Sequence, residues 1–229
     1  KIIKWVLDEG TDNVVFRPFL TNGNPYKSRV LLVGQSANPV LKVEQGSESV
    51  FVEALVNEDL LDDLYRAELL AASREYKGSV QFLKWYEEMY GENVILTSLN
   101  TYQTDSVKEL KALQRQDEVN YDKGVKIFKE VIEEFEPEII ILQGAATVEQ
   151  FKVLYSVNLI LLNSTVTKIQ ELEELGPFAE MFYENGKVVK VFATRSMAYF
   201  GKSGESFGMF KEKLEETLKN IQNTNVPTL

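Results

Sequence analysis

Residues Arg29–Pro39 read R-V-L-L-V-G-Q-S-A-N-P, a short apolar run that ends in a glycine and continues into small and polar residues. A strand that is buried on both faces of a parallel sheet has such a continuous apolar run. In open α/β sheets, ligands bind at the carboxyl ends of the strands. The stretch therefore predicts a central strand at Val30–Val33 and makes the residues after Val33 the first candidates for a functional site.

Outward from this stretch, apolar runs and helical periodicities alternate along the chain. Strands are expected at Asn93–Leu99, Glu138–Gln143, Val157–Leu162, Phe178–Tyr183 and Lys187–Ala193, with an edge strand at Asn13–Phe19. Helices are expected over most of Val50–Tyr90, closed by Gly91, over Val119–Phe135, after Gly144, and in a last segment that carries Phe207, Phe210, Leu214 and Leu218. Asn185-Gly186 is a strong hairpin signal between the last two strands. The alternation predicts a three-layer α/β/α fold with a central, mainly parallel sheet, in one domain over residues 1–229 with a frayed tail from about residue 222.

The composition limits the chemistry. The chain has no cysteine and no histidine, so it offers neither a thiolate nucleophile nor the side chains that most often bind metals, and we expect no metal and no cofactor. The net charge of −10 disfavours DNA as a partner unless a local basic patch exists. No apolar stretch approaches the length of a membrane span, and we expect a cytoplasmic protein without a membrane partner.

Four expected strands end in small or polar residues, at Gly34, Asn100, Gly144 and Thr194. Taken alone, each is an ordinary strand-to-helix turn. In a parallel sheet, however, the carboxyl ends lie along one edge, so the four segments are expected to form one pocket.

The serial order of these segments resembles that of the uracil-DNA glycosylase superfamily. Its first motif is G-Q-D-P-Y-H, or G-x-N-P-G in the mismatch-specific branch, and Gly34–Pro39 reads G-Q-S-A-N-P. Alignment from Gly34 places Ser36 at the aspartate position. Alignment from Pro39 places Asn38 there, with Ser36-Ala37 as an insertion, and also brings Phe51 to the spacing of the family's base-stacking phenylalanine. We therefore prefer Asn38.

Three later motifs extend the resemblance over roughly residues 29 to 220. Leu99-Asn100-Thr101 matches the family's L-N-T signature, whose asparagine pairs with the uracil edge. Leu142-Gln143-Gly144-Ala145-Ala146 is similar to the L-W-G strand end except at the tryptophan, and the segment from Thr194 to Gly201 stands where the family has H-P-S-P-L-S. The resemblance implies a uracil-DNA glycosylase-like fold and a site for a flipped-out base.

The resemblance also assigns roles to the site residues. Asn38 and Thr194 take the catalytic positions, and the base-binding residues are Gln35, Phe51, Asn100, Gly144, Ser196 and Met197, the last as a wedge that fills the duplex. The usual catalytic aspartate and histidine are both replaced. An asparagine can position water but cannot take its proton, and a threonine hydroxyl stabilises an anionic leaving base less than histidine does. We therefore expect slow hydrolysis of the N-glycosidic bond, or hydrolysis at a base other than uracil.

Several of these residues also have a purely structural explanation. Phe51 and Met197 also fit core packing, and Asn38 and Asn100 also fit ordinary turns. The leading hypothesis is a divergent DNA glycosylase that acts in repair by base flipping. The alternatives are a catalytically inactive protein of the same fold that binds a nucleic acid, a nucleotide or a protein, and a small-molecule enzyme acting on a free nucleoside or nucleotide. The last has no phosphate-binding glycine motif in its favour.

Overall fold

The computed structural model describes residues 1–8, 14–21, 23–37, 48–54, 57, 59–60, 63, 72–104 and 106–224. The strands are β1 (Val30–Ala37), β2 (Val94–Gln103), β3 (Ile139–Gln143), β4 (Leu159–Leu161), β5 (Pro177–Phe182) and β6 (Val188–Thr194). The helices are α1 (Glu48–Ala54), α3 (Arg74–Tyr90), α4 (Val107–Gln116), α5 (Glu118–Phe135), α6 (Ala145–Leu154), α7 (Ile169–Leu175) and α8 (Gly208–Thr224). A π-helical turn, η1 (Lys4–Asp8), and two short 3-10 helices, η2 (Met197–Tyr199) and η3 (Glu205–Phe207), complete the described elements.

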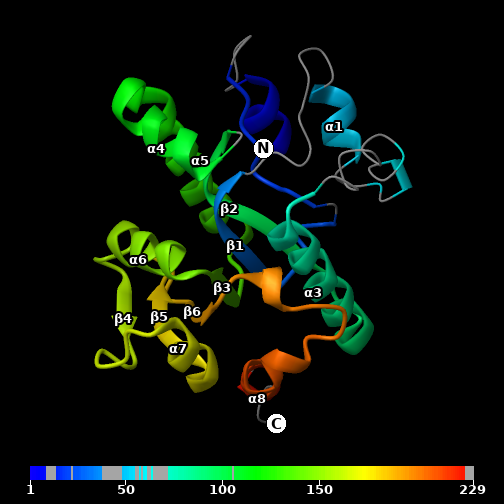
Figure 1. Ribbon diagram of the computed structural model, residues 1–229, viewed down its shortest axis with the longest axis vertical. Helices are drawn as coiled ribbons and strands as arrows, with labels where there is room; N and C mark the ends of the chain where they lie inside the picture. The colour runs from blue at the N-terminus through cyan, green and yellow to red at the C-terminus, as the bar shows by residue number, and fades with distance from the viewer. Residues whose placement is uncertain are drawn as a thin grey trace.

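The described strands form a six-stranded, mostly parallel sheet in the order β2-β1-β3-β6-β5-β4 (Figure 1). The four strands from β2 to β6 in this order are parallel neighbours, and β5 is antiparallel to both β6 and β4. The α/β class and the mainly parallel sheet expected from the sequence are confirmed. Because the four parallel strands are adjacent, their carboxyl ends lie side by side at one edge.

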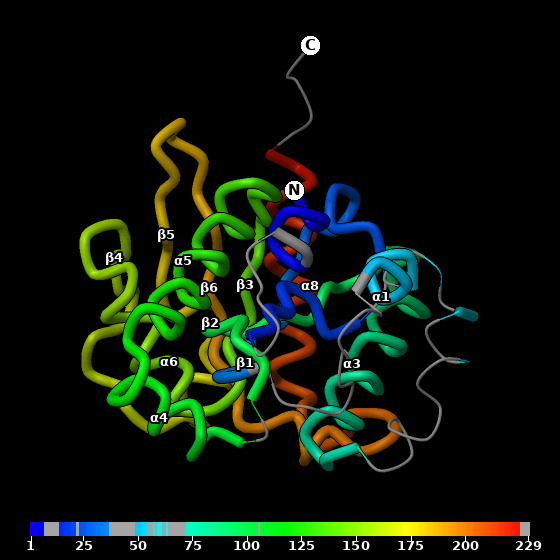
Figure 2. The backbone as a smooth tube through the Cα atoms, turned by 90° about the horizontal axis from the view of Figure 1, so that it is seen from above, coloured from blue at the N-terminus to red at the C-terminus, as the bar shows by residue number. Residues whose placement is uncertain are grey.

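Helices cover both faces of the sheet (Figure 2). On one face, Phe192 of β6 packs edge-on against Phe210 of α8, which also contacts Phe82 of α3. On the other face, Tyr155 at the end of α6 contacts both Phe151 of α6 and Phe128 of α5. The buried apolar side chains form one contiguous core cluster.

Several local signals act as the sequence predicts. Gly91 ends α3 with φ 68°, a left-handed conformation that glycine adopts without steric cost. Gly186, with φ 83°, turns the chain between β5 and β6, where Tyr183 and Lys187 close the hairpin through a 3.0 Å backbone hydrogen bond.

Other boundaries differ from the prediction. Within the described residues 14–19 there is no strand, only isolated bridge residues; the bridge from Phe16 to Tyr102 places this segment beside the outer edge of β2. β4 is shorter than expected, while β1 continues to Ala37 and β2 to Gln103. The last two extend because Ser36 pairs with Asn100 across the two strands. Paired strands hydrogen-bond the backbone N–H and C=O groups of polar and apolar residues alike. The first polar residue after an apolar run therefore does not mark the end of a strand.

Two further expectations fall partly outside the described residues. In the segment expected to be mostly helical, α1 and α3 are described, but much of the chain between them is not. The final helix α8 extends to Thr224, past the residue where fraying is expected to begin.

Candidate functional site at the carboxyl edge of the sheet

The four motif segments meet at the carboxyl edge of the parallel strands. Gly34 of β1 pairs with Ser98 of β2, and Gln143 of β3 pairs with Thr194 of β6. Val33 pairs with Leu142, which places Gly34 level with Gln143. Ser98, Gly34, Gln143 and Thr194 thus form one row across four strands, which we call the polar row.

The polar row is the buried floor of this edge. Residues paired across parallel strands project to the same face, so the side chains of the row share one face of the sheet. Gln143 on this face hydrogen-bonds through its side-chain amide to the Ser79 hydroxyl of α3, and its Oε1 accepts the Met197 N–H at 3.4 Å. Gln143 is 5% exposed and Thr194 is fully buried. A ligand at this edge would therefore lie beyond the row, at the level of Ser36 and Asn100.

Thr194 is the catalytic candidate that the structure places most clearly. Its carbonyl accepts the Gly144 N–H at 2.7 Å, which ties the start of the β3-α6 turn to β6. Its hydroxyl is buried and has no hydrogen-bond partner within the described part of the chain, and the same holds for the Ser98 hydroxyl. Gly144 adopts φ 89°, a conformation that disfavours side chains larger than hydrogen.

Asn100 lies inside β2, and its side-chain amide hydrogen-bonds to backbone groups of α5 and β2. Nδ2 donates to the Tyr121 carbonyl of α5 at 3.0 Å, and Oδ1 accepts the Tyr102 N–H at 3.0 Å. The side chain is 2% exposed and fills the space beside Gly124, where a Cβ would come within 2.0 Å of Oδ1. In this conformation the Asn100 side chain links β2 to α5.

Of the remaining predicted residues that the structure describes, two are half-buried at the carboxyl edge and two are fully buried in the core. Gln35 is half-buried on β1, and Ser196 is half-buried at the rim, where its hydroxyl donates to the Glu75 carboxylate of α3 at 2.6 Å. Met197 is fully buried under α3, so it would have to leave the core to act as a duplex wedge. Phe51 is also fully buried, with the Arg17 guanidinium 4.9 Å from its ring centre. Asn38 lies outside the described residues.

The last loop is fixed by an ion pair that the sequence pattern does not reveal. Arg195 Nε lies 3.2 Å from the Glu173 carboxylate of α7, and the Arg195 backbone N–H donates to the same carboxylate at 2.9 Å. The guanidinium also donates to the Ser206 carbonyl and stacks on Phe207, with its carbon 4.5 Å from the ring centre. Burial raises the pKa of the Glu173 carboxyl above its usual range, and Arg195 offsets part of that rise. Arg195 is therefore engaged within the fold and is not presented to a phosphate.

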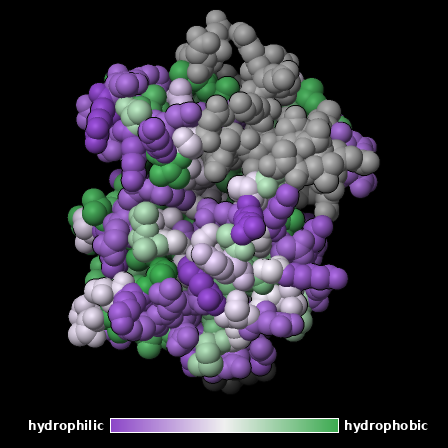
Figure 3. All heavy atoms as spheres, in the orientation of Figure 1, coloured by the Kyte–Doolittle hydropathy of each residue, from purple (hydrophilic) through white to green (hydrophobic). Residues whose placement is uncertain are grey.

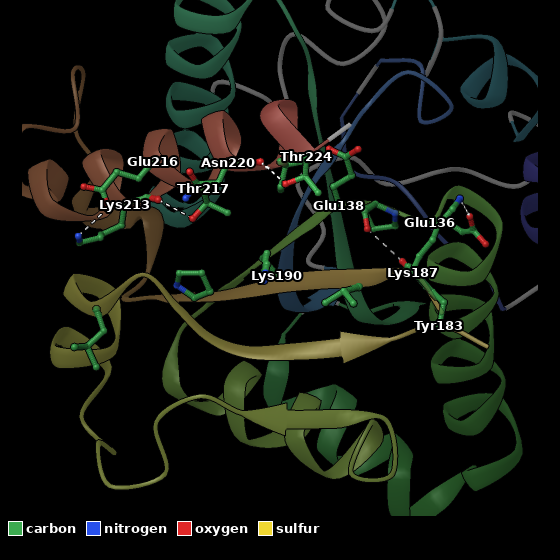
Figure 4. A pocket seen from close by; sticks show the side chains of 15 residues that line it. Glu136, Glu138, Tyr183, Lys187, Lys190, Lys213, Glu216, Thr217, Asn220 and Thr224 are labelled. Carbon is green, nitrogen blue, oxygen red and sulfur yellow. Dashed lines mark hydrogen bonds and ion pairs between the residues drawn. The ribbon is translucent and has the colours of Figure 1, made fainter. Parts of the chain in front are cut away.

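Two hollows lie at opposite ends of the strands of the sheet. One, of about 440 Å³, lies between the carboxyl end of β2 and α4 and is lined by Tyr102, Gln103 and Thr104 among others. The other, of about 860 Å³, lies toward the amino ends of β3 and β6, between the β5-β6 hairpin and α8 (Figure 4). Lys187 forms an ion pair with Glu136, and Lys213 forms one with Glu216. All four residues line this hollow. None of the predicted site residues lines either hollow.

The buried Thr194 hydroxyl gives a first prediction. Thr194→Val should leave the free energy of unfolding unchanged or raise it by up to about 1 kcal/mol, because valine has nearly the same shape and removes a buried polar group that has no partner. Equilibrium urea unfolding measures the change. The matched control is Thr97→Val, which removes a 2.7 Å hydrogen bond from a fully buried hydroxyl to the Pro18 carbonyl. It should cost about 1–2 kcal/mol. A loss of that size in Thr194→Val would contradict the structural assignment.

None of the described helices is both long enough and apolar enough to cross a membrane. In the same part of the chain, no group of three or more acidic residues is arranged to hold a metal ion. No protein-family model matches the sequence, and a search of curated proteins found no significant match.

Proposed function

We propose that this chain is a glycosylase-like protein that binds a nucleobase-containing small ligand at the carboxyl edge of its sheet without efficient hydrolysis of the glycosidic bond. The observation that carries the proposal is the adjacency of four parallel strands, which brings the four motif segments to one edge. Ligands of open α/β sheets bind at such an edge.

The chemistry of the edge favours binding over hydrolysis. Excision of a base needs a donor that stabilises the departing anion, and loss of one such donor costs about 3 kcal/mol of barrier. The chain has no histidine, the Thr194 hydroxyl is fully buried, and the Asn100 amide is bonded to α5 and β2. None of these side chains supplies an exposed donor for the departing anion, so the proposed site would bind its ligand without efficient cleavage of the bond.

The charges around the last loop disfavour a DNA duplex as the ligand. Arg195 is paired with Glu173, and Ser196 at the rim bonds to Glu75. Lys211 donates to the Ser203 carbonyl and lies 5.1 Å from the Trp85 ring centre. The loop therefore has mixed charge, whereas duplex binding depends on a continuous basic surface that displaces counterions from phosphates.

A thermal-shift screen with free bases, nucleosides and nucleotides tests the binding proposal. A ligand present at about 100 times its Kd stabilises the folded state by about 2.7 kcal/mol, which corresponds to roughly 5–10 °C for a chain of this size. Gln35→Ala at the rim should reduce the shift. The control Gln222→Ala, on an exposed part of α8, should not. If no ligand shifts the melting temperature, the binding proposal is wrong.

Hydrolysis is tested separately on single-stranded and duplex oligonucleotides that carry uracil or other altered bases. Alkaline cleavage after incubation reports any abasic site. We expect no product above the background of the Gln35→Ala variant. Base release that depends on Gln35 would instead make the chain a slow, divergent DNA glycosylase.

A further inference from the structure

The carboxyl end of β2 departs from regular pairing beside the proposed site. Ser36 of β1 pairs with Asn100 of β2. The next residue of β1, Ala37, pairs with Gln103, so β2 has two residues at this point that β1 does not match. One of them is Tyr102, whose N–H donates to the Asn100 side chain at 3.0 Å. Such a bulge bends the strand and re-aims its side chains, and bulges are common next to functional sites.

The bulge opens onto the hollow between β2 and α4. The hollow has a volume of about 440 Å³, within the range of sites for small molecules. The Tyr102 ring packs edge-on against Phe16, with ring centres 5.7 Å apart, and this contact holds the ring in place at the hollow. The full lining consists of residues 102–104 and of one face of α4, which presents Glu109, Ala112, Leu113 and Gln116. The hollow therefore adjoins the proposed site but is built from other residues.

The lining can donate and accept hydrogen bonds. The Gln116 amide has both donors and an acceptor, and the Glu109 carboxylate accepts. The Thr104 hydroxyl donates to the Ser106 carbonyl at 3.2 Å, so its lone pairs are what it offers to a ligand. The Tyr102 ring adds apolar surface. A sugar combines hydroxyl groups, which both donate and accept, with apolar C–H groups, and it therefore matches this lining.

Positive charge is absent from the described residues that line the hollow. α4 has three exposed cations, which form a separate stripe of Lys108, Lys111 and Arg115. At 3.6 residues per turn, this stripe is centred roughly 120° around the helix from the face that lines the hollow. Figure 3 shows mainly hydrophilic atoms at the upper left of the molecule, where Figure 1 places α4. In the described lining a phosphate group would meet the Glu109 carboxylate and no cation, so the hollow disfavours it.

We propose that this hollow holds the pentose of a nucleoside whose base lies at the carboxyl edge of the sheet, level with Ser36 and Asn100. The inference rests on the proposed function and narrows the ligand of that site to a nucleoside without a phosphate group. Tyr102 is two residues beyond Asn100 along β2, so a base and a sugar, which are joined by one bond, reach the edge and the hollow together. The Gln116 amide and the Glu109 carboxylate bind the sugar hydroxyls, and the Tyr102 ring packs against the C–H groups.

Isothermal titration calorimetry with matched ligands tests the inference. The ligands are adenosine, guanosine, cytidine and uridine, each compared with its free base and its 5′-monophosphate. For a base that binds, the nucleoside should have a Kd about 10-fold lower than the base, because the sugar adds hydrogen bonds. The 5′-monophosphate should bind no tighter than the nucleoside. A nucleoside no tighter than its base, or a monophosphate that binds best, would overturn the inference and leave the proposed function standing, whereas no binding at all would overturn both.

Filling the hollow should remove the advantage of the nucleoside. Ala112→Trp places a large side chain at an exposed position on the lining face of α4, so it should raise the Kd of the nucleoside about 10-fold and leave that of the free base unchanged. The matched control is Gln114→Trp, at an exposed position roughly 150° away around the same helix, and it should change neither Kd. Equal losses of affinity for base and nucleoside, or no loss for either, would contradict the placement of the sugar.

Reversal of one charge gives an independent test. Glu109→Lys replaces the carboxylate of the lining with an ammonium group. Relative to the nucleoside, the variant should bind the 5′-monophosphate about 10-fold more tightly than the wild-type chain does, because the phosphate then meets an opposite charge. Glu212→Lys makes the same change at an exposed position of α8 and should leave this ratio unaltered. A ratio that Glu109→Lys does not change would place the sugar outside the hollow and overturn the inference.

Discussion

Replacing Gly78 with alanine should lower the free energy of unfolding by about 3 kcal/mol, the upper range for overpacking a core. Gly78 lies inside α3, where an added Cβ would come within 1.8 Å of the Met197 carbonyl oxygen and 2.5 Å of its carbonyl carbon. Both atoms belong to the backbone of η2, so neither can move aside as the end of a flexible side chain would. The gain in helix propensity of about 1 kcal/mol offsets only part of the cost. Equilibrium denaturation of the wild-type chain and the variant measures the loss.

Gly208→Ala is the matched control. Gly208 is the first residue of α8, has ordinary helical dihedral angles, and has nothing within 4 Å of the position of an added Cβ. Alanine there should be neutral or stabilise the protein by up to about 1 kcal/mol, mainly by restricting the unfolded chain. If both variants lose stability equally, the loss reflects removal of glycine in general, and the close packing of α3 on η2 does not cause it.

The fold could be predicted because its main signals are local. Continuous apolar runs mark β1 and β3, and Gly91 and Asn185-Gly186 mark a helix end and a hairpin turn. These signals depend on backbone conformation and on burial of consecutive residues, which neighbouring sequence determines. The alternation of strands and helices predicted a mainly parallel sheet, whereas the order that makes four parallel strands adjacent is given by the structure.

The depth of the site could not be predicted in the same way. Thr194 and Met197 were expected in a loop, but Thr194 is the last residue of β6 and Met197 begins η2, over which α3 packs, and both residues are fully buried. That packing depends on Gly78, more than a hundred residues earlier in the sequence. The polar row likewise arises from register between separate strands. Neither feature leaves a pattern in any one segment.

Arg195→Ala is expected to cost about 3 kcal/mol of stability at neutral pH, the lower end of the range for breaking a buried ion pair. The variant leaves the Glu173 carboxylate, whose side chain is 5% exposed, without its guanidinium partner. It also removes the hydrogen bond to the Ser206 carbonyl and the contact with Phe207, both of which hold the last loop. Lys202→Ala, an exposed position in the same loop, is the control and should change stability by less than about 0.5 kcal/mol.

The pH dependence separates the ion pair from the loss of packing. A carboxyl whose folded pKa is raised contributes stability below its unfolded pKa and loses that contribution as the pH rises through the folded value. Removing Arg195 removes an influence that lowers the pKa of Glu173, so the folded pKa rises further above the usual value. The stability deficit of Arg195→Ala should therefore be larger at about pH 7 than at about pH 4. Adding Glu173→Gln to the variant should abolish this dependence, because glutamine does not titrate. A deficit that is the same at both pH values would mean that Arg195 acts only through its contacts with Phe207 and Ser206.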